Sequence, residues 1–203
     1  FARPWAQSFV ASKGTHMISE EIERQELAVC RELVVRLMEG TRDGSDRPWW
    51  RHAEDVAEAV LGYGWIHPEG WMFWGCVAWM HDLLEDCDGL TDEKLVQELV
   101  AGGVLPFRAT ELVRMVGILT KTKGEGGEYF QRIRDCGQWQ LSLIKILDRL
   151  ANLREGRPVF SESRWAGYVE ETRQHILPLV AIVDADLRER LLVELEAAMV
   201  ERR

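Results

Sequence analysis

Apolar residues recur along most of the chain at the spacing of one helix face. Between Ser19 and Glu39 they follow a period of about 3.6 residues, and Ser19 is well placed to cap the start of a helix. The same pattern predicts further helices, namely one that begins near Pro48, Trp71–Asp86, one capped by Thr91, Phe107–Lys121, one from Tyr129 to Arg134, Gln138–Glu155, Ser161–Ile176 and Pro178–Arg202. No segment alternates strongly enough to predict a strand, and the sequence has no internal repeat. We therefore expect an all-α helical bundle.

The segment Trp71–Asp86 differs from the other predicted helices because a strongly apolar run ends in four ionisable residues. These residues are His81, Asp82, Glu85 and Asp86. In one continuous helix the positions i, i+1, i+4 and i+5 share a face, so the four side chains would converge on one patch. Such a patch can hold a cation and act on a water molecule.

The composition is that of an ordinary globular domain. The chain has 203 residues, of which 46% are hydrophobic and 29% are charged, which is enough for one domain with a sizeable core. We expect this domain to span residues 18–203. Residues 1–17 have the character of a cloning-derived or non-core extension, since the polar run SKGTHM leads to Met17 as a natural first residue.

The charge balance restricts the classes of partner. A formal net charge of −9, from 25 basic and 34 acidic residues, disfavours nonspecific binding to nucleic acid or to an anionic membrane surface, but leaves room for a local basic pocket. No charge-free run of about 18 apolar residues predicts a membrane span, and the N-terminus lacks the pattern of a signal peptide. The four cysteines include no CxxC pair, which favours reduced thiols in a cytoplasmic protein.

Three predicted helices carry residues of the types that bind divalent metals. His52 lies at the start of the second helix, His81 and Asp82 are adjacent, and Asp148 lies within KILDRLANLR. Imidazole and carboxylate together suit Mn²⁺, Fe²⁺ or Zn²⁺ rather than Ca²⁺. Ligands from several helices can meet inside a bundle.

Each of these residues has a plainer interpretation when it is taken alone. His52 at a helix start is more often a surface or capping group, and Asp148 could be a buried ion-pair partner of Arg149 or Lys145. The two acids at the end of the Trp71–Asp86 segment could be a solvated helix end. The combination favours a metal site, because its order and spacing match a known pattern.

That pattern is a single His, then His-Asp, then a distant Asp, all on helices, and it resembles the HD-domain phosphohydrolase superfamily. HDLLED resembles the HDxxED motif of the Rel/SpoT-type alarmone hydrolases and their small single-domain homologues. KILDRLANLR resembles a helix of the same family, and the interval between Asp82 and Asp148 is similar as well. The resemblance covers roughly residues 39–154.

The resemblance implies a single-domain HD-type helical bundle and a metal-dependent nucleotide phosphohydrolase. It implies one Mn²⁺ ion, with other divalent transition metals as alternatives. The ligands carried over are His52, His81, Asp82 and Asp148. Glu85 and Asp86 would place and deprotonate a water molecule, and which of the two takes the proton is left open.

On the substrate side the resemblance implies three residues. Asn152 would contact the nucleotide sugar or its phosphate, Lys145 would meet phosphate or orient its neighbours, and Arg42 would stack on the base. Other cations that could neutralise phosphate are Lys121, Lys123 and Arg149, of which Lys123 also has the character of a solvated loop charge. The chain has PWWRHAE where the family has P-Y-x-x-H-P, a departure that bears on the base more than on the chemistry.

The leading hypothesis is therefore hydrolysis of the 3′-pyrophosphate of the alarmone (p)ppGpp, the nucleotide of the stringent response, by a cytoplasmic enzyme. A hydrolase of another nucleotide, of the 5′-deoxynucleotidase or NADPH phosphatase type, is the nearest alternative. A nucleotide-binding module of the same fold without turnover is the third. The expected partner is a small-molecule nucleotide rather than nucleic acid or membrane, and a homo-oligomer is left open.

Overall fold

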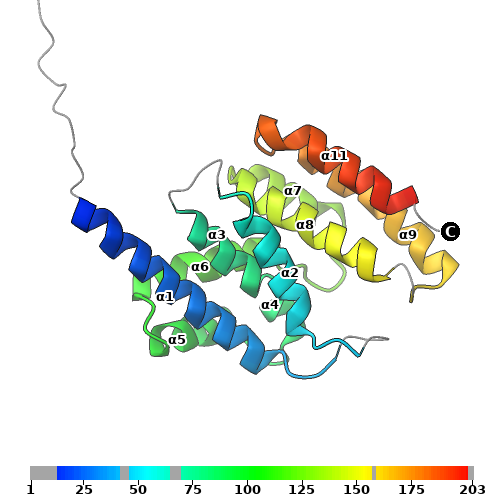
Figure 1. Ribbon diagram of the computed structural model, residues 1–203. Helices are drawn as coiled ribbons and strands as arrows, with labels where there is room; N and C mark the ends of the chain where they lie inside the picture. The colour runs from blue at the N-terminus through cyan, green and yellow to red at the C-terminus, as the bar shows by residue number, and fades with distance from the viewer. Residues whose placement is uncertain (1–12, 42–45, 65–69, 157–158, 201–203) are drawn as a thin grey trace, which may run out of the picture.

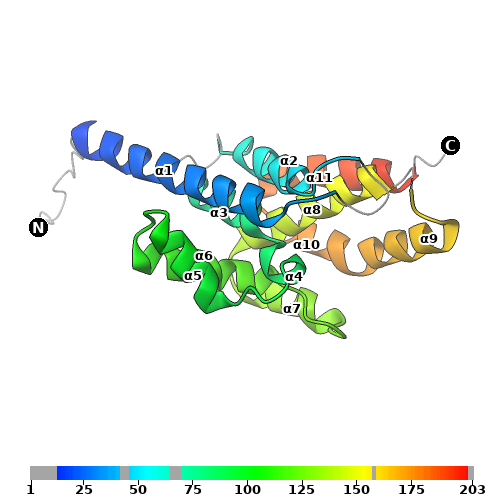
Figure 2. The ribbon, with the colours of Figure 1, turned by 90° about the horizontal axis from the view of Figure 1, so that it is seen from below.

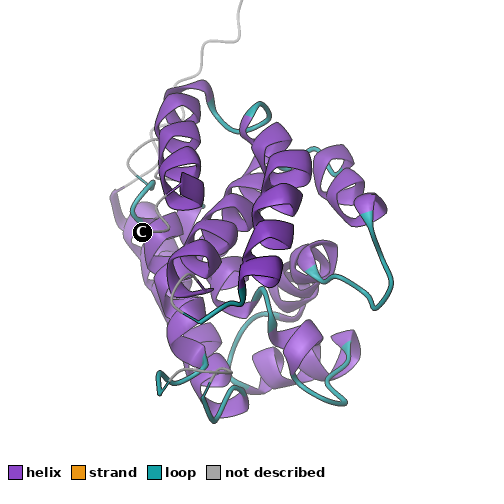
Figure 3. Cartoon of the chain, turned by 90° about the vertical axis from the view of Figure 1, so that its right-hand side faces the viewer, coloured by secondary structure: helices purple, strands orange, loops and turns teal. Residues whose placement is uncertain are grey.

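The computed structural model describes residues 13–41, 46–64, 70–156 and 159–200 (Figure 1). Within these residues the secondary structure is helical, and the only β pairing is an isolated bridge between Thr41 and Pro48 (Figure 3). The elements are α1 (Lys13–Leu37), α2 (Trp50–Leu61), α3 (Trp71–Met80), α4 (Leu83–Asp86), α5 (Asp92–Ala101), α6 (Pro106–Leu119), α7 (Gly127–Asp135), α8 (Trp139–Gly156), α9 (Glu162–Glu171), the π-helix η1 (Thr172–Ile176), α10 (Leu177–Val180) and α11 (Ala185–Val200). The predicted all-α class is confirmed.

Helix α3 lies at the centre of the bundle because it is apolar around its whole circumference. Helices α1 and α2 pack along it, and α6 contacts it as well (Figures 1 and 2). The indole N–H of Trp71 donates to the carbonyl oxygen of Val60 at 2.6 Å, which ties α3 to α2. Gly75 lets the two helices approach closely, since a Cβ there would lie 2.7 Å from a methyl carbon of Leu61. The C-terminal end of α3 therefore has a fixed position.

Helix α8 connects α2 with the C-terminal helices. It packs on α2 and also on α10 and α11. Figure 2 shows α1, α2 and α11 along one side of the molecule and α5, α6 and α7 along the other, with α3 and α8 between them. These two sides are linked by an ion pair. Arg108 of α6 binds the buried Glu26 carboxylate of α1 through two nitrogens, with a shortest N–O distance of 2.6 Å.

The start of the first helix differs from the prediction. Helix α1 begins at Lys13, so Ser19 lies inside it rather than at its cap. Extending an existing helix by one residue costs little, and a residue that favours caps does not stop it. Thr91 does cap α5, where its hydroxyl oxygen accepts the N–H of Lys94 at 3.4 Å.

The predicted helix Pro178–Arg202 is interrupted. Helix α10 ends at Val180 and α11 begins at Ala185. Val183 points into the core with no exposed surface, and the Asp184 carboxylate accepts the N–H of Asp186 at 3.0 Å. The chain therefore leaves the helix to bury Val183 and starts a new helix that Asp184 caps. The apolar period alone does not reveal this interruption.

The described residues contain neither a membrane-spanning helix nor a disulfide. No helix among them combines the length and the apolar character needed to cross a bilayer. All four cysteines lie in the described part of the chain, Cys30 and Cys76 are buried, and none of the four forms a disulfide.

Candidate metal centre

His52 lies in the first turn of α2 and is buried, with 1% of its surface exposed. It is held there because Ala53 and Val56 on the same helix pack into the core. Its Nε2 atom lies 3.1 Å from Oδ1 of Asp148. Its Nδ1 atom lies 3.5 Å from a carboxylate oxygen of Glu155. The ring therefore presents one nitrogen to Asp148 and has an acid behind the other.

The segment Trp71–Asp86 is not the one continuous helix that the sequence predicted. Helix α3 ends before His81, and α4 begins directly after Asp82. Asp82 has φ −99° and ψ −6°, a backbone conformation that is common at functional sites. The break costs little because the Asp82 carbonyl accepts the backbone N–H groups of Glu85 and Asp86, at 3.1 and 2.9 Å, and so starts the new turn.

The two ring nitrogens of His81 have different surroundings. Nδ1 lies 2.7 Å from the carbonyl oxygen of Ala78 and carries the proton, since a carbonyl can only accept. Nε2 is buried and has no hydrogen-bond partner among the described residues, while oxygens of Asp82 and Asp148 lie 3.1 and 3.7 Å away. In the neutral ring this nitrogen directs a lone pair at oxygen lone pairs, which a cation between them would relieve. The residues present therefore fit a metal ion.

Helix α8 supplies Asp148, with Lys145 and Asn152 about one turn away on either side. Oδ1 of Asp148 faces the His52 ring and accepts from the amide of Asn152, while Oδ2 accepts from the Lys145 ammonium at 2.7 Å. One potential ligand atom from each of four residues lies within 4.8 Å of the others, and these residues are His52, His81, Asp82 and Asp148. Three separate parts of the chain thus converge on one cluster.

The charges in this cluster are strongly coupled. Burial by itself would lower the pKa of His81, but the carboxylates of Asp82 and Asp148 raise it to about 10. Burial would raise the pKa of Asp82, and the His81 ring lowers it to about 2. Burial would likewise raise the pKa of Asp148, and the Lys145 ammonium holds it well below its usual range. Two ionised acids that draw positive charge onto a neighbouring ring make a site suited to a cation.

The cluster opens into a cleft of about 700 Å³ that combines acids, cations and aromatic rings. The acids around it, apart from the cluster, are Glu85, Asp86 and Glu155. The cations are Arg47, Lys121, Lys145 and Arg164. Apolar and aromatic walls come from Trp49, Val159, Phe160 and Tyr168. The lining thus offers cations to phosphate oxygens and apolar or aromatic walls to a planar ring.

Glu85 on α4 reaches the cleft and is fixed by the backbone opposite. The N–H of Lys121 donates to its Oε1 atom at 2.5 Å. Partial burial raises the pKa of Glu85, although this N–H and the Lys145 ammonium act in the opposite direction. The carboxylate is therefore both oriented and more basic than an ordinary glutamate, which are two requirements of a general base.

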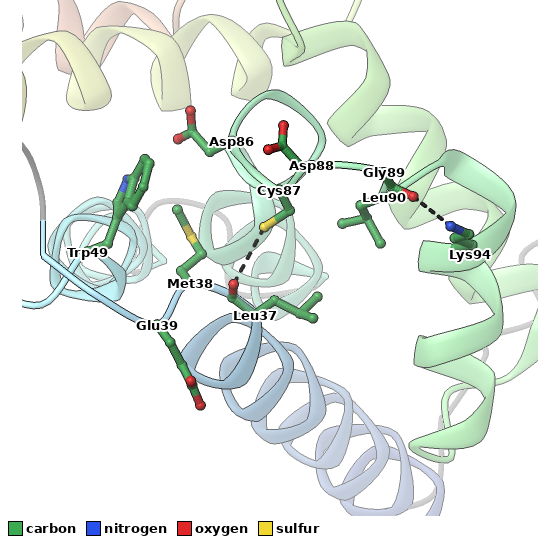
Figure 4. A pocket seen from close by; sticks show the side chains of 10 residues that line it. All are labelled: Leu37, Met38, Glu39, Trp49, Asp86, Cys87, Asp88, Gly89, Leu90 and Lys94. Carbon is green, nitrogen blue, oxygen red and sulfur yellow. Dashed lines mark hydrogen bonds between the residues drawn. The ribbon is translucent and has the colours of Figure 1, made fainter.

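Asp86 lies between the cleft and a second cavity of about 360 Å³ (Figure 4). Trp49 is the other residue that lines both. Inside the second cavity the Cys87 thiol points at the carbonyl oxygen of Leu37, 3.8 Å away. The two acids of the HDLLED motif thus have different places, with Glu85 in the cleft and Asp86 at the wall between two cavities.

Two of the three residues predicted to bind substrate line the cleft, and these are Lys145 and Asn152. Arg42 lies outside the described residues. Both cleft residues also contact Asp148, so their position depends on the metal cluster.

The three further cations of the sequence have different places. Lys121 lines the cleft, and Lys123 is exposed and does not line it. Arg149 is buried and does not line the cleft, but its guanidinium lies 3.8 Å from the centre of the Tyr168 ring, which does. It donates to Glu171 at 2.5 Å.

Several cleft residues were missed by the sequence analysis. Glu155 follows Asp148 by two helical turns, so the spacing on α8 was sufficient to place it on the same face. Arg164 and Tyr168 stand one turn apart on α9 and line the cleft together. Nothing in the sequence indicates that α9 contributes to the site, because that depends on how α9 packs.

No protein-family model matches the chain, and no curated protein is significantly similar to it in sequence. The solved structures that are similar in fold include the following two. One is a metazoan orthologue of SpoT that hydrolyses ppGpp, with 20% identity over 87% of this chain and 95% of that one, and a TM-score of 0.64. The other is Bacillus subtilis YpgQ in complex with ADP, with 14% identity over 89% and 92% of the two chains, and a TM-score of 0.58. The chain therefore has the fold of Rel/SpoT-type HD-domain hydrolases, as predicted.

Proposed function

We propose that this protein is a metal-dependent nucleotide phosphohydrolase that removes the 3′-pyrophosphate of the alarmone (p)ppGpp. The observation that carries this proposal is the cluster of two histidines and two aspartates, with ligand atoms within 4.8 Å of one another, beside a cleft that holds further acids and cations. The similarity in fold to a SpoT orthologue that hydrolyses ppGpp supports the choice of substrate.

The metal would be held by the four residues of the cluster, which are His52, His81, Asp82 and Asp148. Two imidazoles with two carboxylates suit Mn²⁺ and similar transition metals. When bound, the ion supplies positive charge that stabilises a phosphoryl oxygen and makes a water molecule more acidic. The Glu155 carboxylate lies 3.5 Å from Nδ1 of His52, and its charge favours the tautomer with the proton on that nitrogen, which leaves Nε2 for the ion.

Glu85 accepts the proton of the attacking water in this proposal. Its carboxylate is held by the N–H of Lys121, and partial burial raises its pKa. Asp86, on the same short helix, orients the water from the wall of the cleft. A positioned base of this kind contributes about 10²- to 10⁴-fold to a rate.

Positive charge for the substrate phosphates comes from the chain itself. Lys121, Lys145 and Arg164 line the cleft, although the protein as a whole carries a net charge of −9. Asn152 offers an amide to the sugar or to a phosphate. The rings of Phe160 and Tyr168 meet edge to face, with centroids 5.6 Å apart, and provide an apolar wall for a base.

A second candidate is hydrolysis of another nucleotide, such as a 5′-deoxynucleotide or NADPH. It is favoured by Trp49 in the wall of the cleft, at the position where the resembling family has tyrosine, and by the similarity in fold to YpgQ, which was observed with ADP. Tryptophan at this point changes the surface presented to a base and leaves the metal cluster unchanged.

One panel separates these functions. Purified protein with Mn²⁺ is incubated with ppGpp, pppGpp, deoxynucleoside monophosphates and NADPH, and the products are separated by ion-exchange chromatography. Release of pyrophosphate from ppGpp supports the first proposal, and cleavage of another nucleotide with ppGpp intact supports the second. Binding of nucleotide with no product, equal in wild type and Glu85→Gln, would reject both in favour of a binding module.

A further inference from the structure

Glu171, the last residue of α9, contacts two cations from different parts of the chain. Its Oε1 atom lies 3.1 Å from the ammonium of Lys121, in the connection after α6. Its Oε2 atom accepts from the guanidinium of Arg149 on α8 at 2.5 Å. The two cations lower the pKa of Glu171 although burial alone would raise it. The carboxylate is therefore an ionised bridge between α8 and the chain that follows α6.

Arg149 makes the α8 end of this bridge rigid. Its side chain is only 5% exposed, its guanidinium lies 3.8 Å from the centre of the Tyr168 ring, and it also donates to the Tyr168 carbonyl oxygen at 3.4 Å. A buried guanidinium with an aromatic face on one side and a carboxylate on another has little freedom to move. Glu171 is thus anchored to the core of the bundle.

Lys121 carries the bridge onward, because its side chain and its backbone serve different partners. The ammonium is bound by Glu171 and lies 5.5 Å from the centre of the Phe130 ring. The backbone N–H donates to the Glu85 carboxylate at 2.5 Å. Holding the Lys121 side chain therefore holds the N–H that orients Glu85.

The π-helix η1, which follows α9, also helps to hold Glu171 and Lys121 in place. Directly after Glu171 the chain forms the π-helix η1, in which the Thr172 hydroxyl donates to the Tyr168 carbonyl oxygen at 2.7 Å. His175 in the same turn stacks on Phe130, with ring centroids 4.6 Å apart and planes parallel to within 1°. A π-helical turn is rare and is found preferentially at functional sites. Here it fixes the residue that follows Glu171 and supports the ring beside the Lys121 ammonium.

We propose that Glu171 is a positioning residue, which holds the Glu85 carboxylate in its working orientation by anchoring Lys121 to Arg149. The inference rests on the proposed role of Glu85 as general base. Glu171 itself does not line the cleft, so its effect on the reaction passes through Lys121.

The sign of one measurable quantity separates this role from simple electrostatics. Replacing Glu171 with glutamine removes a negative charge, and loss of a like charge lowers the pKa of a neighbouring carboxylate. If the Lys121 N–H moves away from Glu85, the ionised form of Glu85 loses a hydrogen bond and its pKa rises instead. A carboxylate that accepts two or three backbone hydrogen bonds is lowered by roughly 2 pH units, so the loss of one bond corresponds to a rise of about 0.5 to 1 unit.

The test is the titration of the Glu85 carboxyl carbon by ¹³C NMR, in the full chain loaded with diamagnetic Zn²⁺ and assigned with Glu85→Gln. The expected result in Glu171→Gln is a midpoint higher by about 0.5 to 1 pH unit. The matched control is Glu170→Gln, an exposed acid next to it that contacts Gln174, and its midpoint should equal that of the wild type. An equal or lower midpoint in Glu171→Gln overturns the proposal.

Glu171→Asp keeps the negative charge and shortens its reach to Lys121, so it should also raise the midpoint and remains informative if Glu171→Gln folds poorly. Lys121→Met removes a cation and raises the midpoint by charge alone, so it tests the pathway only through the double variant with Glu171→Gln, which should show no further rise. Additive shifts would mean that Glu171 does not act through Lys121. The acid limb of kcat, measured with whichever nucleotide is cleaved, should shift with the NMR midpoint. Because the NMR titration needs no turnover, failure of the positioning role and failure of the proposed reaction are distinguishable.

Discussion

Binding of Mn²⁺ should raise the thermal stability of this protein, because the cluster of ligands exists only in the folded chain. His52 and Asp148 lie 96 residues apart in the sequence, so the unfolded chain contains no comparable site. An ion that binds only the folded state at one hundred times its Kd stabilises it by about 2.7 kcal/mol. For 203 residues the unfolding entropy is about 0.43 kcal/mol/K, which converts this gain into a rise in Tm of about 6 °C.

The assay is differential scanning calorimetry after treatment with a chelator, followed by additions of Mn²⁺. Asp148→Asn removes the charge of a ligand that is 5% exposed and keeps its shape, so it should nearly abolish the rise in Tm. Asp135→Asn changes an exposed acid on α7 and should show the full rise. Ca²⁺, which prefers oxygen ligands, should raise Tm much less than Mn²⁺ does.

Two results would refute the reasoning. A Tm that does not depend on Mn²⁺ concentration in the wild type would show that the cluster does not bind the ion. An equal rise in wild type and Asp148→Asn would place the bound ion elsewhere in the protein. Comparing the rise within each variant, rather than Tm between variants, removes any change that the substitution makes to the metal-free fold.

The remaining predictions concern single residues. Glu85→Gln should retain its metal content and lose about 10²- to 10⁴-fold in kcat, and a variant with wild-type kcat would exclude Glu85 as the base. Asp82→Ala should lose bound metal and activity together, measured by elemental analysis and steady-state kinetics, so a fully active variant would contradict the ligand assignment. Because partial burial raises the pKa of Glu85, its carboxyl group in the metal-free protein should titrate above the ordinary glutamate pKa of about 4.3, and a ¹³C NMR midpoint at or below that pH would argue against it. Arg108→Met should lower the free energy of unfolding by about 3 kcal/mol in urea titrations, because it leaves the Glu26 carboxylate buried at 3% exposure without its partner, whereas a loss below about 1 kcal/mol would show that Glu26 finds another.

The sequence was sufficient for the fold class and for the identity of the residues that converge. His52 and Asp148 each have a plainer interpretation when they are taken alone, and the helical period by itself did not select them. They were identified together with His81 and Asp82 because their order and spacing, and the motifs HDLLED and KILDRLANLR, resemble those of a known family. The packing of α8 against α2 brings them together.

The rest depends on backbone geometry that side-chain patterns do not encode. The turn at His81 and Asp82 was missed because nothing in the apolar period marks it, and no proline or glycine stands there. The partner of Glu85 is the backbone N–H of Lys121, which every residue other than proline possesses, so the sequence gives no sign of it. Glu171 was missed for a related reason, since its two partners come from segments that meet only in the folded chain.

The break after His81 has a consequence for how this site can change over time. The carbonyl of Asp82 starts α4, and it does so with its backbone, so the placement of Glu85 does not depend on which side chain occupies position 82. Substitutions can therefore change the binding of the ion without moving the acids that contact the water, although the residues are neighbours in the sequence. A lineage could exchange or lose the metal ligand at this position while the next turn, with its two acids, stays in place.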